Sequence, residues 1–254
     1  MSWLKFEYLR ILQRYRKLPF PGRRSDFQFQ LRGWDKPLFV RPYTSDIAVL
    51  RELFWSQEYL PAVERCPKPV KTIVALGGNV GYSVRYWQKY LPESLIIVLE
   101  PDPNNYRQLQ KNIDAGGYAH RVTSIQSFAG DRAGEAFLDR STESCMFRMS
   151  EVELPGSLRV TRTTISDLLN LDFKPAQRVD LFKCDIEGAE TQLFSHCRNW
   201  IHHIVYIVVE LHPPYNLVRF QENLRTAGVM LENPWFDVRP GRHLVYSSLK
   251  SIVG

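Results

Sequence analysis

One stretch, residues 72–81, constrains the fold of this chain more than any other. It begins with the run Thr72-Ile-Val-Ala-Leu76, which is aliphatic and β-branched and has the length of a strand. Three glycines and one asparagine follow: Gly77, Gly78, Asn79 and Gly81. A helix-like segment and a second apolar run come next, and that run ends on Glu100. Strand, glycine turn, helix, strand and acid are typical of the first half of a nucleotide-binding α/β sheet.

This order predicts a cofactor site that contains adenosine. Glycines let the backbone approach a ligand closely, and an acid roughly 20 residues beyond the turn can accept both ribose hydroxyls. The G-x-G-x-x-G spacing of nicotinamide-dependent oxidoreductases is absent from residues 77–81. An oxidoreductase is therefore the weaker interpretation of this turn.

The alternation of strands and helices continues along the chain. Strands are expected at 71–76, 95–100, 122–128, 181–185 and 204–210, and helices near 81–91, 104–115, 188–197 and 216–227. Two or three extended segments are expected at 135–164, a short helix at 165–169, and a terminal hairpin from 230–233 and 243–248. This pattern predicts an α/β fold with a doubly wound, mostly parallel sheet that is covered on both faces.

Three regions are expected: 1–24, 25–69 and 70–254. Residues 70–254 form the cofactor-binding domain, and residues 25–69 form an extension with short strands, a helix over 46–58 capped by Ser45, and a proline-marked linker. Residues 3–18 form a basic amphipathic helix before a Pro- and Gly-containing hinge. That helix either packs on the domain or on a partner, which is the favoured interpretation, or lies on a membrane surface.

Composition excludes several classes of protein. The 254 residues contain no apolar run of the roughly 18 residues that cross a bilayer, and charged residues interrupt any N-terminal signal sequence. The four cysteines form no C-x-x-C pair, so neither a zinc site nor a disulfide framework is indicated, and a cytoplasmic location is expected. Much of the basic excess behind the net charge of +6 lies in residues 5–24 and the rest is spread along the chain, so the charge only weakly indicates nucleic acid.

Three predicted strands end on acids, Glu100, Asp185 and Glu210, at the sheet edge where ligands bind. Glu100 is expected to bind the ribose, and its alternative role is to cap the next helix. Asp102 is expected to be a turn or capping residue. Asn79 either bonds a cofactor carboxylate or holds the turn.

Two further polar residues follow these acids at a spacing of two: Glu187 after Asp185, and His212 after Glu210. Glu187 is a candidate catalytic carboxylate, and its alternative role is that of a first-turn acid favoured by the helix dipole. Glu190 is better explained by that first-turn role. His212 is either a general base or a hydrogen-bonded structural histidine. No metal is expected, because His and Cys ligands do not cluster, and Mg²⁺ held by Asp185 and Glu187 is left without support.

These motifs resemble the FkbM family of S-adenosylmethionine-dependent methyltransferases. The family pattern matches Ala75-Leu-Gly-Gly-Asn-Val-Gly-Tyr82, Glu100-Pro-Asp-Pro103, Lys183-Cys-Asp-Ile-Glu-Gly-Ala-Glu190 and Glu210-Leu-His212. The resemblance covers about residues 38 to 212 and includes the segments 40–46 and 57–59. Two positions depart from the pattern: Ala75 stands where the family has an acid, and Gly78 where it has alanine.

The resemblance implies a class I methyltransferase fold with seven strands, the last antiparallel, and S-adenosylmethionine as the cofactor. It implies O-methylation of a sugar, a glycan or a secondary metabolite. The cofactor would be bound by Gly77, Gly78, Asn79, Gly81, Glu100 and Asp185. Asp185 would lie near the transferred methyl group, with Glu187 or His212 removing the acceptor proton.

Around Arg41, Asp46 and Tyr59, the extension is expected to cover the acceptor. Because Ala75 replaces the family's acid, a catalytically silent scaffold is the first alternative to an active O-methyltransferase. An RNA methyltransferase, suggested by the basic charge, is the second alternative.

Overall fold

The computed structural model describes residues 26–142, 145–170, 178–239 and 242–252. The amphipathic helix predicted at 3–18, and with it the expected membrane contact, lies outside the described residues. In the described part of the chain, no helix is long and apolar enough to cross a membrane.

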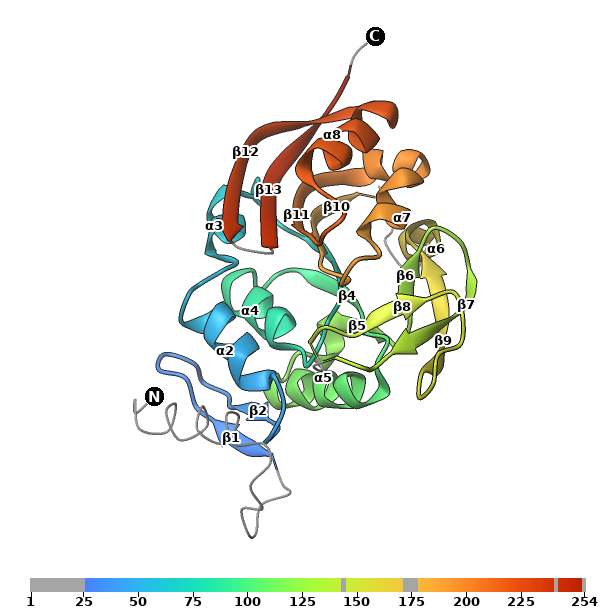
Figure 1. Cartoon of the computed structure of the whole chain (residues 1–254). Coiled ribbons are helices and arrows are strands. Elements are labelled where there is room, and N and C mark those ends of the chain that lie inside the picture. The colour runs from blue at the N-terminus through green and yellow to red at the C-terminus, as the bar shows by residue number, and fades with distance from the viewer. Residues whose placement is uncertain (1–25, 143–144, 171–177, 240–241, 253–254) are drawn as a thin grey trace.

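A seven-stranded sheet forms the centre of the molecule (Figure 1). Its strands, in spatial order, are β12 (Val229–Arg239), β13 (Arg242–Ser251), β11 (Ile204–Leu211), β10 (Val179–Cys184), β3 (Thr72–Leu76), β4 (Leu95–Leu99) and β5 (Val122–Ile125). β13 runs antiparallel to both of its neighbours, and the other contacts in the sheet are parallel. The predicted α/β class I architecture, with its last strand antiparallel, is confirmed.

Helices cover both faces of this sheet. They are α4 (Tyr82–Tyr90), α5 (Pro103–Gly116), α6 (Ile165–Asn170), α7 (Glu190–Ser195) and α8 (Leu217–Thr226). Short 3₁₀ turns occupy 119–121, 197–199 and 201–203. Successive residues of a strand point to opposite faces, so Ile73 and Ala75 belong to one apolar cluster and Val74 and Leu76 to the other. The predicted helix at 188–197 is shorter than expected, because α7 ends at Ser195 and a 3₁₀ turn follows.

The extension packs on one face of the sheet and shares its apolar cluster. It consists of the hairpin β1 (Phe27–Phe29) and β2 (Leu38–Val40), then α2 (Asp46–Phe54) and α3 (Leu60–Arg65). Two local predictions are wrong here. Ser45 occupies the position before α2 but makes no side-chain capping bond, and the Ala48 backbone N–H donates to the Ser45 carbonyl at 2.9 Å. The supposed linker around Pro61 contains helix α3, because proline is tolerated in the first turn of a helix.

A second, four-stranded sheet follows β5 in the chain. It contains β6 (Phe128–Gly130), β9 (Leu158–Thr164), β7 (Gly134–Asp139) and β8 (Arg148–Ser150), in that spatial order. The single strand predicted at 122–128 is therefore divided between two sheets. Ser127 stabilises the junction, because its hydroxyl donates to the Thr161 carbonyl of β9 at 2.9 Å.

Candidate active site

The glycine turn brings the ends of β3, β4 and β10 together. Gly77 has a φ of +75°, and a Cβ atom at this position would lie 1.9 Å from the Asp185 carbonyl oxygen. Gly78 donates from its backbone N–H to the Leu99 carbonyl at 2.7 Å. A Cβ at Gly78 would lie 2.4 Å from the Val98 side chain, so the packing of this chain requires glycine where the resembled motif has alanine.

Glu100 lies at the end of β4 and is bound directly to the turn. Its Oε2 accepts from the Asn79 backbone N–H at 2.7 Å, and its Oε1 accepts from the Asp102 N–H at 3.0 Å. Burial raises the pKa of Glu100 to about 7, although these hydrogen bonds oppose the shift. The alternative role of helix cap belongs to Asp102, whose Oδ1 accepts from the N–H groups of Asn104 and Asn105.

Two pockets open at this edge of the sheet. The β4 pocket has a volume of about 590 Å³, including space open to solvent, and is lined by Leu99, Glu100, Asn105, Phe128, Phe147 and Ile186 among others. The α2 pocket has a volume of about 1100 Å³ on the same measure and is lined by residues of α2 and by Tyr59, Lys183, Glu210 and His212 among others. Five residues line both pockets: Gly77, Asn79, Cys145, Asp185 and Glu187. The two pockets therefore meet at the glycine turn and at the end of β10.

The site residues predicted from the sequence are divided between the two pockets. Among the described residues that line a pocket, Glu100 belongs to the β4 pocket and His212 to the α2 pocket, while Asp185 and Glu187 face both. Gly78 lines the α2 pocket, whereas Gly81 packs against Leu109 of α5 with a φ of +84°.

The residues expected to cover the acceptor are also divided. Tyr59 lines the α2 pocket, whereas Arg41 and Asp46 pair with each other at the start of α2.

His212 is surrounded by carboxylates. Its Nδ1 lies 2.9 Å from Glu190 Oε1, and its Nε2 lies 3.4 Å from both Glu187 Oε2 and Glu210 Oε1. Burial lowers the pKa of His212, but the hydrogen bonds to Glu190 and Glu210 outweigh it and raise the pKa to about 11. His212 is therefore an imidazolium, with a carboxylate beside each ring nitrogen.

Glu190 contributes more to this site than its place in a first helical turn predicts. Its side chain is fully buried and accepts from the backbone N–H groups of Gly188 at 2.9 Å and Ile186 at 3.2 Å. It thus holds the strand-to-helix corner and orients His212 at once. The only sequence signal for this role is the position of Glu190 within the Asp185–Glu190 motif that resembles the family.

Glu187 has both like and unlike charges as neighbours: the carboxylate of Asp185 and the ring of His212. Burial and the neighbouring Asp185 raise its pKa, and the charge of His212 lowers it, with a net rise above the ordinary value. One ligand atom each from Asp185, Glu187 and His212 lies within 4.8 Å of the others, but the protonated His212 would have to lose a proton before all three could bind a metal ion.

Lys183 is a buried cation that the sequence interpretation did not single out. Its ammonium donates to the Leu76 carbonyl at 3.0 Å, the Gly77 carbonyl at 2.7 Å and Asp185 Oδ2 at 3.0 Å. Lys183 lies opposite Ala75 in the parallel register of β10 and β3, so both side chains point to the same face of the sheet. The ammonium therefore binds the end of β3 and the start of the glycine turn. Ala75, which stands where the family has an acid, belongs to the same strand β3.

Comparison with known proteins decides the family. Residues 76–227 match the Methyltransferase FkbM domain. The chain belongs to the FkbM family of methyltransferases. Family membership confirms the resemblance and makes S-adenosylmethionine the methyl donor, as expected.

A curated relative is also named a methyltransferase, and two solved structures show the same fold. Methyltransferase 1 of Beauveria bassiana (strain ARSEF 2860) is 25% identical over 141 residues, which are 46% of this chain and 55% of the relative. This chain thus matches about half of that relative's length. A putative transferase, PH0793, from Pyrococcus horikoshii has a TM-score of 0.52 at 14% identity, over 90% of this chain and 72% of that one. TYW2 of M. jannaschii in complex with AdoMet has a TM-score of 0.51 at 14% identity, over 92% and 90%. Both structures share the fold.

The departure of this FkbM chain at Ala75 is directly testable. An aspartate at position 75 would stand beside the Lys183 ammonium, which now binds Asp185. We expect Ala75→Asp to tighten S-adenosylmethionine binding roughly fivefold, because the new carboxylate would pair with the Lys183 ammonium and release Asp185 to the pockets that it lines. Isothermal titration calorimetry measures the change, with Ala75→Asn as the uncharged control. Equal affinities of Ala75→Asp and the wild type would contradict this account of the position.

Proposed function

We propose that this FkbM chain transfers a methyl group from S-adenosylmethionine to a hydroxyl of a neutral polyhydroxylated acceptor such as a sugar. The observation that carries the proposal is the junction of two pockets at Asp185 and Glu187. A cofactor in the β4 pocket and an acceptor in the α2 pocket would meet at these two side chains. This arrangement supplies the proximity that methyl transfer needs.

The β4 pocket has groups that fit the cofactor. Glu100 would accept the ribose hydroxyls, and the apolar side chains of Leu99, Phe128 and Ile186 would contact the adenine. In the part of the chain that the structure describes, Asn79 Oδ1 is buried without a hydrogen-bond partner. An acceptor atom of this kind suits the ammonium of the methionine part. S-adenosylmethionine, when bound, supplies a methyl group already activated on a sulfonium.

Glu187 is the better candidate for the base. His212 already carries its proton and faces carboxylates at both ring nitrogens, so it has no lone pair to offer. Glu187 has a raised pKa and lies at the junction of the pockets, where the acceptor hydroxyl would come. In this proposal Glu187 takes the hydroxyl proton as the new C–O bond forms, and His212 holds Glu187 in place.

The charges of the α2 pocket favour a neutral acceptor over a phosphorylated one. Its acidic lining residues are Glu52, Glu58, Asp185, Glu187 and Glu210. Three basic residues also line it, but Lys183 binds the glycine turn and His212 binds Glu190. The third described basic residue of this pocket, Arg148, takes part in neither of these two contacts. A phosphate would meet mostly like charge here, which disfavours RNA as the acceptor.

We expect Glu187→Gln to lower kcat about 100-fold with little change in cofactor affinity, because positioning remains and the base is lost. In the wild type the rate should rise with pH through the raised pKa of Glu187, since the base must be ionised, and this limb should vanish in the variant. Transfer of a tritiated methyl group to a panel of neutral glycans measures both effects. Glu64→Gln, on the exposed surface of α3, is the matched control.

The same assay, with transfer RNA added to the panel of acceptors, separates the alternatives. Labelled transfer RNA and unlabelled glycans would establish an RNA methyltransferase and contradict the neutral acceptor. Binding of S-adenosylmethionine without transfer to any acceptor would favour the silent scaffold. If the Glu187→Gln enzyme kept the wild-type rate and pH profile, Glu187 would not be the base.

A further inference from the structure

Arg41 joins elements that belong to the two different pockets. Its guanidinium holds Asp46 in a fork, with Nη2 2.7 Å from Oδ1 and Nε 3.0 Å from Oδ2, and its backbone N–H donates to Oδ2 at 2.9 Å. Asp46 is fully buried and is the first residue of α2. Four residues of α2 line the α2 pocket: Ala48, Val49, Glu52 and Leu53. The Arg41 side chain is therefore bound to the start of the helix that forms the wall of the acceptor pocket.

The same guanidinium is linked through Asn105 to the carboxylate of Glu100. Its Nη2 also donates to Asn105 Oδ1 at 2.9 Å, and the Asn105 amide lies 3.4 Å from Glu100 Oε1. Asn105 lines the β4 pocket. A continuous series of polar contacts thus runs from Asp46 through Arg41 and Asn105 to Glu100.

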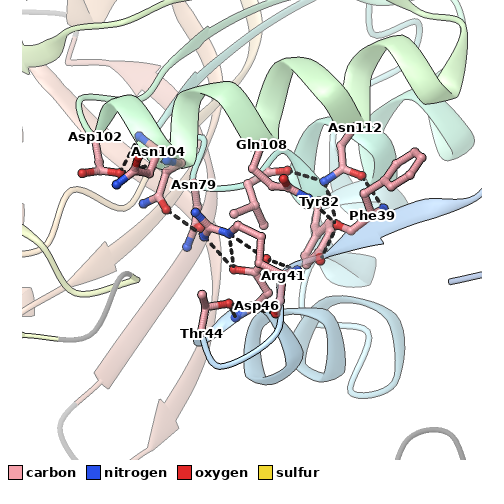
Figure 2. Close-up of polar contacts among 12 residues, drawn as sticks. Phe39, Arg41, Thr44, Asp46, Asn79, Tyr82, Asp102, Asn104, Gln108 and Asn112 are labelled. Atoms are coloured by element: carbon pink, nitrogen blue, oxygen red, sulfur yellow. Dashed lines mark hydrogen bonds and ion pairs between the residues drawn. The ribbon is translucent and has the colours of Figure 1, made fainter. Parts of the chain in front are cut away.

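The backbone just before Arg41 is held to the body of the domain. Figure 2 shows Phe39 of β2 surrounded by side chains of α4 and α5. Its N–H donates to Asn112 Oδ1 at 2.7 Å, and its carbonyl accepts from Asn112, Gln108 and Tyr82 at 3.0–3.1 Å. These bonds fix the backbone of β2 two residues before Arg41, so the Arg41 side chain starts from a defined position.

We propose that Arg41 is a positioning residue that couples cofactor binding in the β4 pocket to the placement of α2 over the α2 pocket. When the ribose occupies Glu100, the Asn105 amide and the Arg41 guanidinium are restrained, and the restraint reaches Asp46 through two charge-assisted hydrogen bonds. The coupling rests on the proposed place of S-adenosylmethionine in the β4 pocket. It is independent of which acceptor is methylated.

Hydrogen exchange of the α2 amides tests the coupling without any acceptor. S-adenosylhomocysteine is the probe, because it carries the same ribose. In the wild type, saturating probe should slow exchange over 46–54 at least fivefold, the lower range of allosteric coupling. Arg41→Lys should still bind the probe but lose the slowing, because an ammonium cannot hold Asp46 in a fork and reach Asn105 together.

Two further variants keep the result interpretable. Arg51→Lys changes an exposed arginine of the same helix and should retain the wild-type slowing. Asn105→Ala leaves the Arg41–Asp46 pair intact and should lose the slowing, so it decides the outcome if Arg41→Lys fails to fold. The proposal is overturned if bound probe leaves α2 exchange unchanged in the wild type, or if both Arg41→Lys and Asn105→Ala keep the slowing. None of these outcomes depends on O-methylation.

Discussion

Replacement of Lys183 by methionine is expected to lower the free energy of unfolding by about 3 kcal/mol and to abolish detectable cofactor binding. The side chain of Lys183 is 3% exposed, and its ammonium satisfies two carbonyls of the glycine turn and one oxygen of Asp185. Methionine has a similar volume but no donors, so the Gly77 carbonyl and Asp185 would lose their bond to the ammonium, while the Leu76 carbonyl would keep only its 3.3 Å bond from the Asp185 backbone N–H. The estimate is at the lower end for a broken buried pair, because Asp185 is 28% exposed and water can solvate it.

Urea unfolding followed by circular dichroism measures the stability change, and calorimetry with S-adenosylmethionine measures binding. Lys89→Met is the matched control, since the ammonium of Lys89 also donates to a carbonyl, that of Gly33, but at an exposed position. We expect that control to change stability by less than about 0.5 kcal/mol. A Lys183→Met protein with wild-type stability and affinity would contradict the role of Lys183 in holding the turn.

Glu100→Ala is expected to weaken S-adenosylmethionine binding about 100-fold. Each hydrogen bond between a ribose hydroxyl and a carboxylate contributes about 1.5 kcal/mol, and alanine removes both. The Asn79 backbone N–H would also lose its bond to Oε2, which loosens the turn. Asp102→Asn is the control: it keeps a side chain that can cap α5, and Asp102 contacts Glu100 only through its backbone N–H among the hydrogen bonds described.

The affinity should also depend on pH in a direction that Glu100 sets. Its pKa in the free protein is raised to about 7, so the neutral carboxyl predominates below that pH. Ribose hydroxyls donate to the ionised form, and cofactor binding should therefore strengthen as the pH rises from 6 to 8. Titrations across this range in the wild type and in Glu100→Gln measure the effect, which the variant should lack. A pH-independent wild-type affinity would show that Glu100 stays ionised throughout.

The same raised pKa has a consequence for folding. An acid whose pKa is higher in the folded than in the unfolded state binds more protons when folded, so stability falls as the pH rises from the unfolded value toward 7. Bound cofactor should remove part of this loss, because it supplies partners for the charged carboxylate.

Local patterns predicted the features that depend on neighbouring residues in the chain. The run before Gly77, the φ values that only glycine adopts readily, and the acid at the end of the next strand follow from short-range geometry. The same holds for the alternation of strands and helices, which predicted the main sheet. The largest error occurs where a distant segment competes: at residues 122–128, strand β6 leaves the main sheet to pair with β9.

The sequence by itself determined that this chain would place a glycine turn and several acids at one edge of a parallel sheet, because strand direction and periodicity are local properties. Only the tertiary structure decided what those groups do to one another. Glu190 and His212 are 22 residues apart, and Lys183 and Gly77 are 106 apart, yet they are in hydrogen-bond contact. Burial and the distance to neighbouring carboxylates set the charge of His212, and neither can be obtained from residue type alone. The histidine that the sequence left open between base and structural residue is, in the folded chain, an imidazolium held among acids.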